Sequence, residues 1–170
     1  MTKSNWILTY YQKIKNGSIV VGRWIELVLE YIVKGLQEKQ FFYDQKKANE
    51  AIDWIEEHAF HTEGPMAPQP LKLELWEKAL VASIYGLVNE EGFRQFREVV
   101  LIVARKNGKS LFASAIADYV FRVKGGYGTR VFCLAPKLEQ ADIIYQDIWQ
   151  HTILDPEWQD LKRAIEASGS

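Results

Sequence analysis

The sequence contains a single cysteine, Cys133, among its 170 residues. One cysteine excludes a disulfide within the chain and fits a reducing cytoplasm. The sequence also lacks the Cys/His framework of a structural zinc site, and no apolar run approaches the ~18 residues that a membrane-spanning helix needs. No apolar segment of the signal-peptide type stands at the N-terminus. These absences predict a cytoplasmic protein without a membrane anchor.

The chain has no overall excess of one charge, because its formal net charge is −1. The charges are nevertheless distributed unevenly along the sequence. Residues 94–137 hold nine Lys or Arg and two Asp or Glu, whereas the remainder holds twelve Lys or Arg and twenty Asp or Glu. If the charges of this segment also cluster in space, their positive potential would attract a nucleotide or a nucleic acid.

The basic segment contains the most informative stretch, VVLIVARKNGKS at residues 99–110. Five apolar residues, Val99–Val103, predict a buried strand, and a polar turn follows at residues 104–108. Lys109 and Ser110 then lead into a helix with apolar residues at helical spacing from Leu111. A strand, a glycine-containing turn, Lys-Ser and a helix are the parts of a nucleotide phosphate-binding loop (P-loop, or Walker A motif).

The chemistry of such a loop explains why these residue types would stand together. A helix N-terminus directs unpaired backbone N–H groups and the positive end of its dipole at an anion. The lysine reaches the β- and γ-phosphates, and the serine hydroxyl can ligate Mg²⁺. The standard pattern has a further glycine five residues before Gly108, where this sequence has Val103. A coincidental turn between a strand and a helix is therefore the alternative interpretation.

The order of the predicted elements favours an α/β fold, with a partial P-loop NTPase-type βαβ unit preceded by an N-terminal helical region. Helices are predicted from Ser18, from Asp44, over Leu71–Val88, from Leu111 to Val123, from about Lys137 to His151, and after Pro156. The Val99–Val103 strand and a second apolar strand at Thr129–Ala135 would be parallel and joined by a right-handed crossover. Two strands do not make a stable parallel sheet, and neither ends in the Asp-Glu pair that would hold Mg²⁺ through water.

The N-terminal region shows the periodicity of amphipathic helices. In the helix from Ser18, the face opposite the charged residues carries Trp24, Leu27, Val28, Tyr31 and Ile32. His58 and His61 match no standard zinc spacing, so we interpret them as solvated residues at a helix end. The stretch TEGPMAPQP at residues 62–70 predicts a loop or linker. We place the boundary there, which divides the chain into an N-terminal helical region, 1–64, and a partial P-loop ATPase domain, 65–170.

Three stretches resemble the N-terminal ATPase region of the large terminase subunits of tailed bacteriophages, the motors that pump DNA into proheads. They are LKLELWEKALVASIYGLV, FREVVLIVARKNGKSLFASAIADY and VFCLAPKLEQADIIY. Upstream, YYQKIKNGSIVVGRWIELVLEYI and FFYDQKKANEAIDWIE resemble the helical lead-in of the same family, so the resemblance runs from about Tyr10 to Gln150. An RKNGKS loop without the first glycine is a known departure in this family, which makes Val103 an expected residue.

The resemblance also implies which residues bind ATP and Mg²⁺. The implied catalytic residues are Arg105 and Lys109. The implied nucleotide-binding residues are Lys106, Asn107, Gly108, Lys109, Ser110 and Trp76. Ser110 is also the implied ligand of Mg²⁺. Arg105 corresponds to the loop arginine that is proposed to stabilise charge on the transferring phosphate, a role that suits a permanently charged guanidinium. The alternative for Arg105 is an ordinary surface arginine. Lys137 and Gln140 match a region that couples nucleotide state to DNA in related motors.

Trp76 matches a tryptophan near the adenine in this family. The residue after it is usually glutamine, and here it is Glu77. The alternative for Trp76 is a core anchor of its own helix.

For a full-length protein, the resemblance implies double-stranded DNA, the small terminase subunit and the portal as partners, in the cytoplasm of a bacterial host cell. The acidic strand-end pair and the nuclease domain of the family lie beyond residue 170. A chain that ended there is expected to lack nuclease activity, to hydrolyse ATP poorly and to self-associate through unpaired strands. The alternative is a non-catalytic prophage remnant or a protein-interaction module without ATPase activity.

Overall fold

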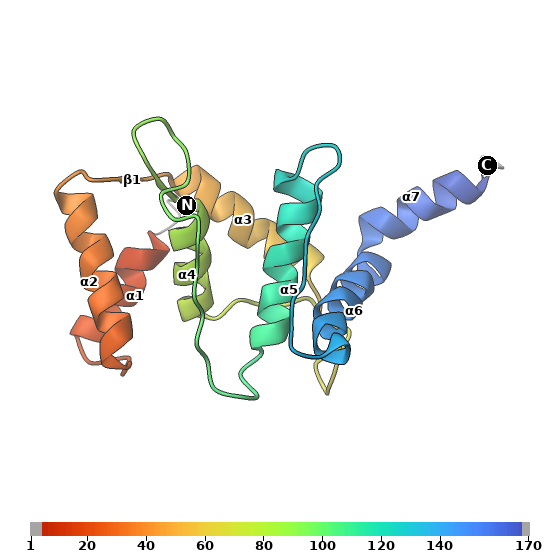
Figure 1. Cartoon of the computed structure of the whole chain (residues 1–170), viewed down its shortest axis with the longest axis horizontal. Coiled ribbons are helices and arrows are strands. Elements are labelled where there is room, and N and C mark those ends of the chain that lie inside the picture. Colours follow the sequence, from red (N-terminus) through yellow and green to blue (C-terminus); the bar gives the residue numbers. More distant parts are fainter. Residues whose placement is uncertain (1–4, 168–170) are drawn as a thin grey trace. The chain divides into compact units, whose positions relative to one another are not determined.

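The computed structural model describes residues 5–167, except for the side chains of 161–162 and 164–167. Its elements, in order, are α1 (Trp6–Lys15), α2 (Arg23–Gln37), β1 (Phe42–Tyr43), α3 (Gln45–His58), α4 (Leu75–Tyr85), β2 (Leu87–Val88), α5 (Lys109–Tyr119), the π-helix η1 (Val120–Lys124), α6 (Leu138–Leu154) and α7 (Pro156–Ala167), as drawn in Figure 1. The chain forms two compact units. Unit 1 comprises the residues up to Asp53 with Leu73–Leu101, and unit 2 comprises Trp54–Lys72 with the residues from Ile102 onward. Within residues 5–167, no helix is both long and apolar enough to cross a membrane.

Unit 1 is built on helix α1, which packs against α2 and α4. Its N-terminus is capped by Asn5, whose side-chain oxygen accepts hydrogen bonds from the first-turn backbone N–H groups. Asp44 caps α3 in the same way, since its Oδ1 accepts from the backbone N–H of Lys47 at 3.0 Å. The predicted helix start at Asp44 is therefore confirmed. Strands β1 and β2 pair antiparallel, with Phe42 opposite Val88.

Helix α2 differs from its prediction in both its start and its buried face. It begins at Arg23 rather than Ser18, and its core contacts come from Leu29, Ile32 and Val33. Of the predicted apolar face only Ile32 is buried, whereas Trp24, Leu27, Val28 and Tyr31 are exposed. The prediction was wrong because this helix is apolar on two sides, and periodicity does not say which side meets the core.

Unit 2 is built on helix α5, which packs against α6 and continues into η1, while α6 contacts α7. Phe112, Ala115 and Tyr119 are all buried, so the apolar residues that recur at helical spacing from Leu111 do form a buried face of this helix. The helix widens at its end, where the N–H of Gly125 donates to the carbonyl of Val120 at 2.7 Å, five residues back. The helices predicted near residues 71–88, at residues 137–151 and after Pro156 are confirmed as α4, α6 and α7.

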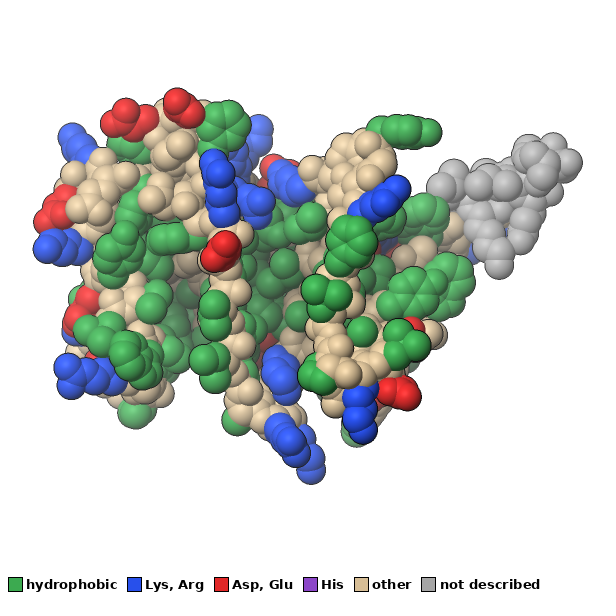
Figure 2. Space-filling view, viewed as in Figure 1, with side chains coloured by type: hydrophobic (Ala, Val, Ile, Leu, Met, Phe, Trp, Pro, Cys, Tyr) green, Lys and Arg blue, Asp and Glu red, His purple; other side chains and the backbone are tan. Residues whose placement is uncertain are grey.

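The two predicted strands on either side of α5 are not formed. Residues 99–103 and 129–135 form no regular secondary structure, and within the described residues neither segment pairs with a strand. Val100, Ile102, Phe132 and Leu134 are 76–93% exposed rather than buried, and Figure 2 shows hydrophobic side chains on the surface there. A strand of a parallel sheet needs neighbouring strands that hydrogen-bond to its backbone, and other elements that pack on both faces of the sheet. The described residues provide neither for these two segments. The chain is mainly helical with a small antiparallel sheet, which is consistent with an α/β assignment, whereas the βαβ unit is not confirmed.

Candidate functional site

The predicted phosphate loop is an exposed turn that leads directly into α5. Lys106 and Gly108 both adopt left-handed backbone conformations, with φ of 66° and 67°. Glycine adopts such a φ without strain, whereas a lysine rarely does. The side-chain amide of Asn107 folds back and donates to the carbonyls of Ala104 and Arg105, at 3.3 and 3.4 Å. These bonds give the turn a defined shape although it is exposed.

The N-terminus of α5 is open to an anion. Gly108 is the N-cap residue and offers no side chain to the first turn, which also lacks an acidic residue. The first backbone N–H groups of the helix therefore have no side-chain cap and add to the positive end of the dipole. Lys109 is exposed and Ser110 is half-buried in this first turn. This arrangement can bind a phosphate group.

Most of the predicted site residues lie together in this turn of unit 2: Arg105, Lys106, Asn107, Gly108, Lys109 and Ser110. Within the described residues, Arg105, Lys106 and Lys109 have no ion-pair partner, so their charges are available to a ligand. Figure 2 shows Lys and Arg side chains gathered at the tip of this loop. Trp76 instead lies half-buried in the first turn of α4, in unit 1. Its contact with an adenine stays a prediction.

Helix α5 is held by a buried hydroxyl–carboxylate contact close to the loop. Asp147 of α6 accepts a hydrogen bond from the hydroxyl of Thr62 at 2.7 Å, and the hydroxyl of Ser114 lies 3.5 Å from its other oxygen. Ser114 is completely buried and Asp147 is 9% exposed. The proline-rich segment that contains Thr62 is thereby connected to α6, which packs against the helix of the phosphate loop.

The far end of α5 carries a buried network of charged side chains. Arg122 of η1 donates to both oxygens of Asp118, at 2.9 and 2.7 Å, and to Asp155 at 2.6 Å. His58, at the end of α3, contacts the same oxygen of Asp155 through Nδ1 at 2.9 Å. Both carboxylates are fully buried, and the guanidinium also lies over the ring of Trp54, 4.7 Å from its centroid. The network joins α5 to the corner between α6 and α7.

The network should make the stability of the protein sensitive to acid. Burial of Asp155 favours its neutral form, but hydrogen bonds from Arg122, His58 and the backbone N–H of Glu157 outweigh this effect. Together they lower the pKa of the Asp155 carboxyl from its ordinary value of 3.8. A group whose pKa is lower in the folded state stabilises that state above the unfolded pKa, and this contribution disappears as the pH falls through the folded pKa.

We therefore expect Asp155→Asn to lower the melting temperature of the protein near neutral pH. The difference between variant and wild type should shrink progressively once the pH falls below 3.8. Thermal melts followed by circular dichroism over this range test the prediction, and a constant difference at every pH would contradict it. Asp160→Asn, at an exposed carboxylate that the structure places in a surface ion pair, serves as the matched control.

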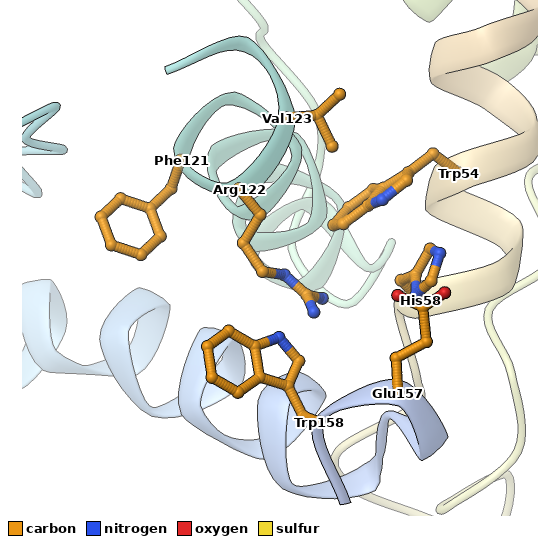
Figure 3. Close-up of a pocket in the computed structure, with 7 residues that line it drawn as sticks. All are labelled: Trp54, His58, Phe121, Arg122, Val123, Glu157 and Trp158. Atoms are coloured by element: carbon orange, nitrogen blue, oxygen red, sulfur yellow. The ribbon is translucent and has the colours of Figure 1, made fainter. Parts of the chain in front are cut away.

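A cavity of about 430 Å³ opens beside this network, lined by Trp54, His58, Phe121, Arg122, Val123, Glu157 and Trp158 (Figure 3). His58, Asp155 and Glu157 offer ligand atoms within 4.8 Å of one another, a spacing that a metal ion could use. A cation there would compete with Arg122 for the same oxygen of Asp155. We therefore assign these residues to an ion-pair network rather than to a metal centre.

Sequence reasoning missed this network for a specific reason. His58 was interpreted as a solvated residue, and that interpretation is wrong, because it is 7% exposed. Its partner Asp155 lies 97 residues further along the chain, a pairing that no local pattern reveals. The available signal was Asp118 and Arg122, an acidic and a basic residue one helical turn apart on an otherwise apolar face.

Comparisons with known proteins place these features in a family. Residues 75–165, more than half of the chain, match the family described as terminase large subunit, ATPase domain. The terminase large subunits of Lactococcus phages p2 and SK1 are each 23% identical to the chain over 142 residues, which cover 81% of this chain and 26% of theirs. The chain thus spans about a quarter of the length of these relatives, and no solved structure matches it. The loop at residues 104–110 and helix α5 fall inside the matched residues, and the chain belongs to the terminase large subunit family through its ATPase domain.

Proposed function

We propose that the loop at residues 104–110 binds the phosphates of ATP together with Mg²⁺, and that the chain is the nucleotide-binding part of a phage DNA-packaging motor. The observation that carries the proposal is the uncapped N-terminus of α5, with Lys109 and Ser110 in its first turn, in a chain of the terminase ATPase family. Family membership and loop geometry support the same site independently.

Each residue of the loop has a role in this proposal. Lys109 binds the β- and γ-phosphates, and Ser110 ligates Mg²⁺. The backbone around Asn107 and Gly108 cradles the phosphates, with Lys106 adding positive charge. Arg105 stabilises charge on the transferring phosphate, since a guanidinium offers several donors and stays charged. Trp76 of α4 contacts the adenine.

The wider part of the proposal concerns the partners. In a full-length protein the motor would act on double-stranded DNA, with the small terminase subunit and the portal, in the cytoplasm of the bacterial host. The exposed apolar segments at 99–103 and 129–135, which form no strand here, are suited to pair with further strands, including those of a second copy. We also retain the division into a helical region, 1–64, and an ATPase domain, 65–170, as part of the proposal.

A second candidate function is a protein-interaction module without ATPase activity. The observation that favours it is the exposed apolar face of α2, where Trp24, Leu27, Val28 and Tyr31 are 41–81% exposed. Large exposed apolar patches mark interaction surfaces. This reading predicts no nucleotide binding, so one titration separates the two candidates.

The test is a titration of the whole chain with a fluorescent ATP analogue, with and without Mg²⁺. We expect saturable binding that is tighter with Mg²⁺, and a loss of at least about tenfold in affinity in Lys109→Ala, because a charged hydrogen-bond partner of the phosphates is removed. Lys46→Ala, at an exposed lysine of α3, is the matched control and should bind like the wild type. Equal binding by wild type and Lys109→Ala, or no binding by either, would refute the nucleotide site.

A further inference from the structure

Helix α2, which lies beside α1 in Figure 1, carries apolar residues on two opposite sides. Leu29, Ile32 and Val33 are buried. A second set is 41–81% exposed and forms what we call the exposed stripe: Trp24, Leu27, Val28 and Tyr31. At 3.6 residues per turn, this stripe is centred about 140° around the helix from the buried residues. Four large apolar side chains on one exposed helix face have the properties of a contact surface.

The stripe is held in place by the core of its own unit. The ring of Tyr31 lies 6.3 Å from that of Phe41, measured between centroids, and Phe41 is 1% exposed. Phe41 in turn packs on Gly35 of α2, where a Cβ would collide with its ring. This end of the stripe is therefore ordered before it meets a partner, which lowers the entropic cost of binding.

The charged residues of α2 all fall on one side of the exposed stripe: Arg23, Glu26, Glu30 and Lys34. The other side carries Ile25 and no charged residue of this helix. Arg23 and Glu30 are opposite in charge and two turns apart. Within the described residues, no ion pair involves Arg23, while Oε1 of Glu30 accepts from Lys15 at 2.6 Å and its Oε2 remains for a second cation.

This one-sided pattern is complementary to itself in one orientation. In a parallel helix pair, the charged side of one helix would meet the uncharged side of the other. In an antiparallel pair the two charged sides meet, so Arg23 of each helix lies near Glu30 of the other. A two-fold axis between Leu27 and Val28 also places Trp24 against Tyr31 of the second helix. Such an interface uses the same surface on both copies, as closed dimers do.

We propose that two copies of this chain associate through the exposed stripe of α2, antiparallel, with an ion pair between Arg23 and Glu30 at each end. The helix has 15 residues and is about 22 Å long, so we expect a weak dimer with a dissociation constant of about 10 µM. The inference names the occupant of this face, and it holds whether or not the loop at residues 104–110 binds ATP.

The first test is sedimentation equilibrium of the whole chain over a range of concentrations, which should show a monomer–dimer equilibrium. Trp24→Ala should raise the dissociation constant at least about tenfold, because it removes the largest exposed anchor of the stripe. Arg23→Gln should raise it about threefold and reduce its dependence on salt. Leu134→Ala, at a residue that is 93% exposed outside α2, is the matched control and should dimerise like the wild type.

The second test determines the orientation by disulfide cross-linking in a Cys133→Ser background. Val28→Cys should cross-link two copies, because the residue lies beside the two-fold axis. Lys34→Cys should not, because its two copies would be about 20 Å apart along the antiparallel pair. Cross-linking of Lys34→Cys as readily as Val28→Cys would contradict the antiparallel arrangement.

The remaining outcomes concern the occupant of the face. A wild-type chain that stays monomeric at every concentration would refute the dimer and leave the stripe to a different protein or to a lipid surface. Loss of the dimer in Leu134→Ala but not in Trp24→Ala would place the association at residues 129–135 and also refute the inference. Each variant should bind the fluorescent ATP analogue like the wild type, so a failed ATP titration and a failed dimer are recorded separately.

Discussion

Replacing Arg122 by alanine is expected to destabilise the protein by about 3–5 kcal/mol, because it leaves two buried carboxylates without their cation. The Arg122 side chain is only 11% exposed, and those of Asp118 and Asp155 are not exposed at all. Removing one partner of a buried ion pair lowers the free energy of unfolding far more than removing one partner of a surface ion pair, which contributes about 0–1 kcal/mol to stability. Urea unfolding followed by circular dichroism measures the difference.

Two further variants make this result specific to the network. Arg122→Lys keeps the charge but cannot form the two parallel bonds to Asp118, so its stability should lie between those of wild type and Arg122→Ala. Arg97→Ala removes an exposed arginine and should change the free energy of unfolding by no more than about 0.5 kcal/mol. An Arg122→Ala protein as stable as Arg97→Ala would show that the buried charges do not contribute to folding.

Phe112→Ala should have an effect of similar size, about 3–5 kcal/mol, for a different reason. Phe112 is 1% exposed and lies one turn after Gly108, in the helix that packs against α6. Truncation removes a large apolar side chain and leaves a cavity that a close-packed core fills only in part. Leu138→Ala, at a residue that is 83% exposed, is the control and should be nearly neutral. Equal thermal melts for the two variants would contradict the assignment of Phe112 to the core.

Local patterns in the sequence predicted the parts of the fold that depend on local chemistry. The helix start at Asp44, the apolar spacing of the helix from Leu111 and the new helix at Pro156 are all confirmed, since each is determined within a few residues. The loop at residues 104–108 also stands where the Lys-Ser motif placed it, at the start of a helix. Periodicity is informative where a helix has one apolar side.

The errors occurred where distant parts of the chain decide the outcome. Periodicity could not choose between the two apolar sides of α2. The segments at 99–103 and 129–135 have the composition of buried strands, but a strand also needs partners, and composition does not reveal whether they are present. The contact between His58 and Asp155 could not be predicted either, because the two residues are 97 positions apart in the sequence.

The most direct measurement of the proposed ATP site is a residue-resolved titration of the ¹⁵N-labelled chain with ATP and Mg²⁺ by NMR. The account predicts that the largest shifts occur at the backbone N–H groups of Asn107, Gly108, Lys109 and Ser110, because these groups would face the phosphates. Lys109→Ala should abolish the shifts at equal ligand concentration. Shifts confined to residues outside 104–112, or a spectrum that does not change at saturating ATP, would contradict the assignment of this loop as the nucleotide site.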